Sequence, residues 1–145
     1  MQRSHPVFIY YDTSTDSLAA FDRKAMNGIG SPSTIKLSGE SFRAGFGLSR
    51  LEIDFPTHVI TFHELVHALH SAQGKLLPKV EDPMSSVWTD AEERRTITFY
   101  ENIYRYELDI PLRCSHHTGI HLVNSPLLIK ACEDVRDQFK FLGNA

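Results

Sequence analysis

Five consecutive residues carry the strongest chemical signal in the chain: His63-Glu64-Leu65-Val66-His67. In an α-helix, residues i and i+4 lie one above the other on one face, so His63 and His67 can bind one metal ion together. Imidazole nitrogens are common ligands of Zn²⁺. Glu64 then lies beside the metal, where its carboxylate can take a proton from a zinc-bound water. The motif predicts a zinc-dependent hydrolase with Glu64 as general base. The alternative is a helix with two ordinary half-buried histidines and a surface glutamate.

A catalytic zinc ion also needs a third protein ligand and an open position. His70 is seven residues beyond His63, about 10.5 Å along the helix axis, so it cannot complete the site from the same helix. The HExxHxxGxxH pattern is excluded, because His70 stands at its glycine position and Gln73 at its last histidine. A carboxylate from a later helix is therefore the better candidate.

Three glutamates in the following helical segment could supply that carboxylate: Glu92, Glu93 and Glu101. Glu93 shares its helix face with the apolar residues four, seven and eleven positions later, and we expect that face to be buried. Glu93 is therefore the favoured third ligand. Glu92 is better explained as a capping-box partner or as a group that holds a ligand histidine. Glu101 lies off this face, where it could hydrogen-bond a loop.

The elements that must position these residues follow from apolar spacing and turn residues. The predicted strands are a buried strand over Val7–Tyr11 and two short ones over Thr34–Leu37 and Leu51–Ile53. The predicted helices are Ser17–Asn27, a zinc helix from the cap Asp54 and Pro56 to Gly74, a second helix from the capping box Thr89–Glu92 to Pro111, and a last helix from Ser125 to about Phe141. Residues 75–88 and 114–124 are predicted to be irregular.

Each of the two central helices has a predicted buried face. The residues are Val59, Phe62, Val66 and Leu69 in the zinc helix, and Ile97, Tyr100, Tyr104 and Leu108 in the second helix. Strands early in the chain and helices late in it predict an α+β fold, a small zincin-like single domain over residues 1–145.

Composition excludes several other classes of protein. The formal net charge of −3 provides no basic field for nucleic acid or anionic membranes. The chain has no run of about 18 apolar residues that could span a membrane. The two cysteines, Cys114 and Cys132, are too few for a disulfide framework and are expected to be reduced thiols. We expect a monomer.

The segments around the motif resemble two families of zinc peptidases. His63-Glu64-Leu65-Val66-His67-Ala68-Leu69-His70 is similar to the zinc helix of the clostridial neurotoxin light chains, and Glu92-Glu93-Arg94-Arg95-Thr96-Ile97 to their downstream Glu-Glu segment. In those toxins the second glutamate is the zinc ligand, which agrees with Glu93.

A nearer resemblance is to the NleD-type bacterial effector metallopeptidases, over about residues 55–117. It rests on the HELxHA helix, Glu92-Glu93, Glu101-Asn102, Arg105, Pro111 and Arg113. The resemblance implies a type III secreted virulence protein that acts in the host cell cytoplasm on a protein substrate. For this family the implied substrates are stress-activated MAP kinases. The sequence has no obvious secretion region ahead of the first strand, so we expect a shortened form.

The developing oxyanion of such a reaction needs a cation or hydrogen-bond donor. The neurotoxins use an Arg-x-x-Tyr segment, and Arg113-Cys114-Ser115-His116 occupies the comparable place here. Arg113 and His116 are therefore candidate catalytic residues. His116 stands where tyrosine is expected, and a protonated imidazole would donate the same hydrogen bond. The alternative for Arg113 is a surface charge or a salt bridge to a helix.

The resulting hypothesis is a zinc endopeptidase. The strand around Thr34–Leu37 is expected to pair with an extended substrate. Two alternatives stay open: a zinc amidase that acts on a non-protein amide, and a non-catalytic binding module that keeps the metal helix as a scaffold.

Overall fold

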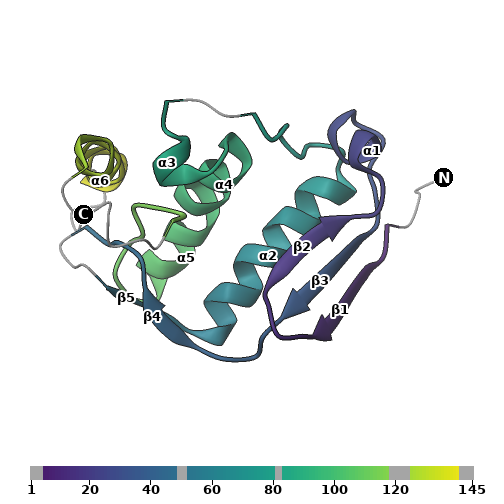
Figure 1. The fold of residues 1–145 in the computed structure, drawn as a ribbon, viewed down its shortest axis with the longest axis horizontal. Helices are drawn as coiled ribbons and strands as arrows, with labels where there is room; N and C mark the ends of the chain where they lie inside the picture. Colours follow the sequence, from purple (N-terminus) through teal and green to yellow (C-terminus); the bar gives the residue numbers. More distant parts are fainter. Residues whose placement is uncertain (1–4, 49–51, 81–82, 118–124, 141–145) are drawn as a thin grey trace. The chain divides into compact units, whose positions relative to one another are not determined.

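The computed structural model describes residues 5–48, 52–80, 83–117 and 125–140. It confirms the α+β fold, with short strands in the N-terminal half and helices predominating in the C-terminal half (Figure 1). The chain divides into two compact units. Unit 1 combines Met1–Glu40 with Thr57–Pro78, and unit 2 combines Ser41–Pro56 with Lys79–Ala145. The expectation of one domain over residues 1–145 stays a prediction.

Unit 1 contains a three-stranded sheet in the order β1-β3-β2 (Figure 1). β1 (Val7–Tyr11) pairs parallel with β3 (Ser33–Leu37), and β2 (Asp16–Ala19) pairs antiparallel with its other edge. β3 alternates buried and half-buried side chains, the pattern of a strand with one face in the core. Because both edges of β3 are paired, the expectation that Thr34–Leu37 adds a substrate strand is wrong.

Two other predictions for this unit are wrong. Val7–Tyr11 does form a strand, at one edge of the sheet, but all five of its side chains are exposed. Ser17–Asn27 is not one helix. Its first residues belong to β2, and only Asp22–Met26 is helical (α1). Pairing with β3 overrides the local helix preference of the Ser17 segment.

The predicted zinc helix is α2 (Thr57–Ala72). Ala68 packs against Ile35 and Leu37 of β3, which fixes α2 on the sheet. The helix ends before Gly74, as predicted. Gly74 has φ +70, and a Cβ there would lie 2.5 Å from the backbone of Gly28, so only glycine fits this stop.

The buried face of α2 differs in part from the predicted one. Val59 and Val66 are buried as predicted, whereas Phe62 is half-buried and Leu69 is exposed. Histidines take up much of the buried stripe instead: His63, His67 and His70.

Unit 2 begins with a two-stranded antiparallel sheet of β4 (Phe42–Ala44) and β5 (Ile53–Phe55). Phe42 and Phe55 stack across it, with ring centroids 4.7 Å apart. Asp54 therefore lies in a strand, and the prediction that it caps the zinc helix is wrong. Its carboxylate is 3.0 Å from the guanidinium of Arg43. The strand predicted over Leu51–Ile53 is displaced toward Phe55, and Leu51 lies outside the described residues.

Helices make up most of the described residues in the rest of unit 2 (Figure 1). α3 (Ser85–Trp88) is a short helix within the segment predicted as a loop. One continuous helical run follows: α4 (Ala91–Thr96), the π-helix η1 (Ile97–Glu101) and α5 (Asn102–Glu107). α6 (Pro126–Phe139) closes the unit, with proline in its first turn as predicted, and residues beyond 140 lie outside the described part. The core residues are Phe46, Val87, Trp88, Ile97, Leu112, Cys114, Leu128, Ala131, Val135 and Phe139.

The buried face of this helical run is not the predicted apolar one. Ile97 is buried, but Leu108 is 40% exposed and the tyrosines between them are half-buried. Glu101 and Arg105 are almost fully buried instead. A π-helix adds a residue to the turn and changes which side chains face inward, so the 3.6-residue period does not hold across Ile97–Glu101.

Cys114 and Cys132 are both free thiols, and Cys114 lies in the core of unit 2. A hydrogen bond that the Cys114 thiol donates to Cys132, together with burial, raises the pKa of Cys114. Among the described helices, none is long and apolar enough to cross a membrane.

Candidate metal site

The two motif histidines of α2 converge on one point. His63 and His67 are both buried, and their Nε2 atoms lie 3.1 Å apart. The i, i+4 spacing within one helix places the two rings on the same face, one turn apart. Two nitrogens on one tetrahedral zinc ion at 2.0–2.1 Å would be about 3.3 Å apart. The imidazole pair of unit 1 therefore has the geometry of two ligands for one metal ion.

Two further polar residues of α2, Glu64 and His70, lie near the histidine pair in the sequence. Glu64 is half-buried next to the pair. His70 is buried, with 2% of its surface exposed, on the same stripe of the helix.

The start of α4 fixes the backbone at Glu93. Asp90 is the N-cap residue, and its carboxylate accepts a hydrogen bond of 2.9 Å from the Glu93 amide. The predicted capping box with Thr89 as the cap is wrong by one residue. Glu92 is not a capping partner either, because its carboxylate accepts hydrogen bonds from Thr96 and Arg95 of the same helix.

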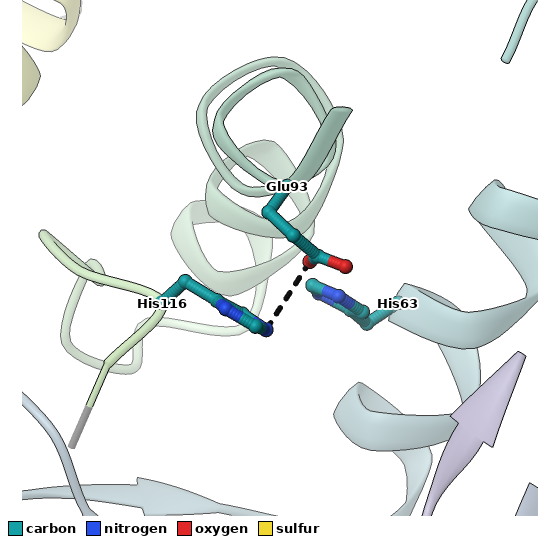
Figure 2. A group of neighbouring side chains, drawn as sticks. All are labelled: His63, Glu93 and His116. Carbon is teal, nitrogen blue, oxygen red and sulfur yellow. Dashed lines mark ion pairs between the residues drawn. The ribbon is translucent and has the colours of Figure 1, made fainter. Parts of the chain in front are cut away.

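Glu93 and His116 form an ion pair within unit 2. His116 Nε2 lies 3.3 Å from Glu93 Oε2, as the dashed line in Figure 2 marks. Glu93 comes from α4, whereas His116 belongs to the segment that follows α5. The backbone amide of His116 donates to the carbonyl of Val87 in α3, at 2.9 Å, so α3 anchors the segment that presents the imidazole.

Three of the described residues are candidate metal ligands: His63 in unit 1, and Glu93 and His116 in unit 2, all drawn in Figure 2. Each offers one ligand atom, an imidazole nitrogen or a carboxylate oxygen. Two imidazoles and one carboxylate suit Zn²⁺ and also other divalent transition metals. The group contains two of the three predicted ligands and the candidate catalytic residue His116.

Arg113 belongs to a buried charge network in unit 2. Its guanidinium donates to Glu101 at 2.9 Å and to the carbonyls of Ser115 and His116 at 2.7 and 3.0 Å. Glu101 also accepts from Arg105 at 2.7 Å. Arg113 thus combines the predicted salt bridge to a helix with a second role, in which it holds the main chain at His116.

The network places two guanidinium groups against one carboxylate. Arg105 and Arg113 both lie over the ring of Phe55, with centroid distances of 4.8 and 4.7 Å. Burial lowers the pKa of Arg105, an effect that Glu101 opposes. Glu101 hydrogen-bonds a residue beyond its own helix, in line with the loop contact predicted for it.

Sequence reasoning missed Thr89 as a residue of this region. Thr89 Oγ1 lies 2.6 Å from Nδ1 of His116 and 3.1 Å from Nε2 of His117. A threonine at the edge of a capping pattern gives no sign of this contact. The only hint of a polar partner near this region was the His116-His117 pair, because imidazole nitrogens need hydrogen-bond partners when they are buried.

No model of a known protein family matches the chain. A comparison with curated proteins finds no significant match.

Proposed function

We propose that the protein is a zinc-dependent endopeptidase in which His63, His67 and Glu93 hold the metal ion and Glu64 is the general base. The observation that carries the proposal is the 3.1 Å separation of the two Nε2 atoms on α2, with Glu64 next to His63 in the chain. A helix that served only as a scaffold would have no need of this carboxylate.

The donor set suits zinc. Two buried imidazoles supply borderline nitrogen ligands and a carboxylate supplies the third, which leaves a position for substrate. When bound, zinc would supply a Lewis acid that polarises the scissile carbonyl and lowers the pKa of water.

The remaining steps belong to side chains of this protein. Glu64 takes a proton from the attacking water and returns it to the leaving amine nitrogen. His116, beside Glu93, donates a hydrogen bond to the oxygen of the scissile carbonyl as negative charge develops on it. Arg113 contributes indirectly. Its guanidinium donates to the carbonyls of Ser115 and His116 and so fixes the backbone that carries the His116 imidazole.

The resemblance to NleD-type effectors supplies the substrate class for the proposal. It favours a protein delivered by a bacterial type III system that cleaves a host protein, with stress-activated MAP kinases as the first substrates to assay. Such substrates would present an extended, exposed loop, which is the form of chain that a peptidase cleaves most readily.

Glu64→Gln provides the main test. The variant should keep stoichiometric zinc by elemental analysis and lose about 10²–10⁴-fold in kcat, because the carboxamide cannot accept the proton. Cleavage is measured by mass spectrometry on a peptide library and on purified kinases. Glu40→Gln, an exposed carboxylate in the same unit, is the matched control and should match wild type.

Two results would overturn the proposal. One is a Glu64→Gln protein with wild-type cleavage, and the other is a zinc-free protein as isolated that does not take up zinc. Hydrolysis of small amides but of no peptide would mean that the protein is an amidase and not an endopeptidase.

A further inference from the structure

Thr89 has a backbone conformation that β-branched residues rarely adopt. Its φ is 70° and its ψ is −62°. The amide of Asp90 donates to the carbonyl of Trp88 at 2.8 Å, which makes Thr89 the centre of a γ-turn of the rare, strained kind. Such strain persists only where surrounding contacts impose it, and it is concentrated at functional sites. The contacts of the Thr89 side chain therefore indicate what the turn holds in place.

The Thr89 hydroxyl lies between two imidazoles. Nε2 of His117 is 3.0 Å from the carbonyl oxygen of Ser85 as well as 3.1 Å from Thr89 Oγ1. A carbonyl oxygen can only accept, so His117 Nε2 carries a proton and donates. The hydroxyl proton of Thr89 is then left with one ring acceptor, Nδ1 of His116.

Thr89 Oγ1 and His116 Nδ1 are 2.6 Å apart, within hydrogen-bonding distance. A ring that accepts at Nδ1 carries its proton on Nε2 when it is neutral. That nitrogen lies 3.3 Å from Oε2 of Glu93, and a carboxylate oxygen is an acceptor.

We propose that Thr89 and His117 hold neutral His116 in the tautomer with its proton on Nε2. His116 then presents an N–H toward Glu93 and the reacting oxygen, and not a lone pair toward the metal. This makes His116 a hydrogen-bond donor to the oxyanion without the protonation that its place in the sequence had suggested. Thr89 and His117 are positioning residues, because they act through the His116 ring. The tautomer is independent of the proposed function, whereas its use in catalysis rests on it.

Nitrogen-15 NMR of the metal-free protein tests the tautomer directly. The ring signals of His116 are assigned by their loss in His116→Asn and recorded at a pH above the ordinary imidazole range. We expect a protonated Nε2 and a bare Nδ1 that accepts a hydrogen bond. A proton on Nδ1 would overturn the proposal.

Three substitutions separate the hydroxyl from the strained turn. Thr89→Val keeps the shape and the β-branch but loses the hydroxyl, so the Nδ1 resonance should move to the position of an unbonded nitrogen. Thr89→Ser keeps the hydroxyl and should restore the wild-type resonance. Thr98→Val removes a threonine hydroxyl that donates to the Arg94 carbonyl instead, and it should leave His116 unchanged. An unchanged Nδ1 resonance in Thr89→Val would refute the role of Thr89.

Kinetics test the use of the tautomer. Thr89→Val should lower kcat by about 10–100-fold with little change in KM, the usual effect of losing a partner that orients a catalytic imidazole. Thr89→Ser should recover the rate. If no variant cleaves peptides, the proposed function fails, and the NMR result still decides the tautomer. If cleavage occurs but Thr89→Val is fully active, the catalytic use of the tautomer is refuted.

Discussion

The two compact units hold their chemical groups in different ways. In unit 1 the imidazoles of His63 and His67 meet because they are one turn apart on a single regular helix. In unit 2 Glu93 and His116 come from distant parts of the chain. Their positions depend on a helix cap, a strained turn and a buried charge network. The first arrangement can be read from five residues, whereas the second depends on the folding of much of its unit.

The largest effect is expected from loss of the buried charge network of Glu101, Arg105 and Arg113, which we regard as the scaffold of unit 2. Glu101→Gln leaves Arg105 and Arg113 buried without a counter-charge, which should lower the free energy of unfolding by about 3–5 kcal/mol. Urea denaturation followed by circular dichroism measures the change. Glu107→Gln removes an exposed carboxylate from the same helical run and should change stability by less than about 0.5 kcal/mol. Equal stabilities for the two variants would mean that the network is not the scaffold.

Metal binding provides the next comparison. Removal of either proposed ligand, by His67→Ala or Glu93→Ala, should weaken zinc binding by more than about 100-fold. Loss of a residue that only hydrogen-bonds a metal ligand usually weakens metal binding by about 10–100-fold. Competition with a chromophoric chelator measures the affinity. His58→Ala removes an exposed imidazole from the same helix as His67 and should bind zinc like wild type. Retention of stoichiometric, tight zinc by Glu93→Ala would exclude it as a ligand and leave the metal to unit 1.

The smallest effect concerns the helix cap that orients Glu93. Asp90→Ala removes the acceptor for the Glu93 amide and should cost about 1 kcal/mol of stability. Thermal unfolding measures it, with the exposed Asp137→Ala in α6 as control. A cost no larger than that of the control would show that α4 forms without the cap. Asp90 would then not be needed to fix the backbone at Glu93.

The sequence predicted well wherever local periodicity decides the structure. α2, its stop at Gly74, and α6 with Pro126 in its first turn lie close to the predicted bounds. Helical spacing and terminal residues are local signals, and tertiary contacts rarely overturn them in long helices. The convergence of His63 and His67 follows from the same regularity.

Predictions failed where long-range contacts decide. Pairing with β3 turned the Ser17 segment into a strand, and the side chains of β1, which look like core residues in the sequence, are exposed. Thr89 could not be foreseen in its γ-turn, because threonine disfavours positive φ and nothing in its neighbours marks the turn. These features depend on partners that lie far away in the chain.

The π-helix η1 has a consequence for how this helical run tolerates change. Each residue of an α-helix advances the direction of its side chain by about 100°. A π-turn holds about one residue more than an α-turn, so the five residues Ile97–Glu101 turn the chain about as far as four α-helical residues would. In a plain α-helix of the same sequence, every side chain after η1, including that of Arg105, would be rotated by about 100° relative to Glu93. η1 thus sets the direction of Arg105 relative to Glu93, and a one-residue insertion between Glu93 and Ile97 should turn Arg105 away from the buried side although no functional residue is substituted.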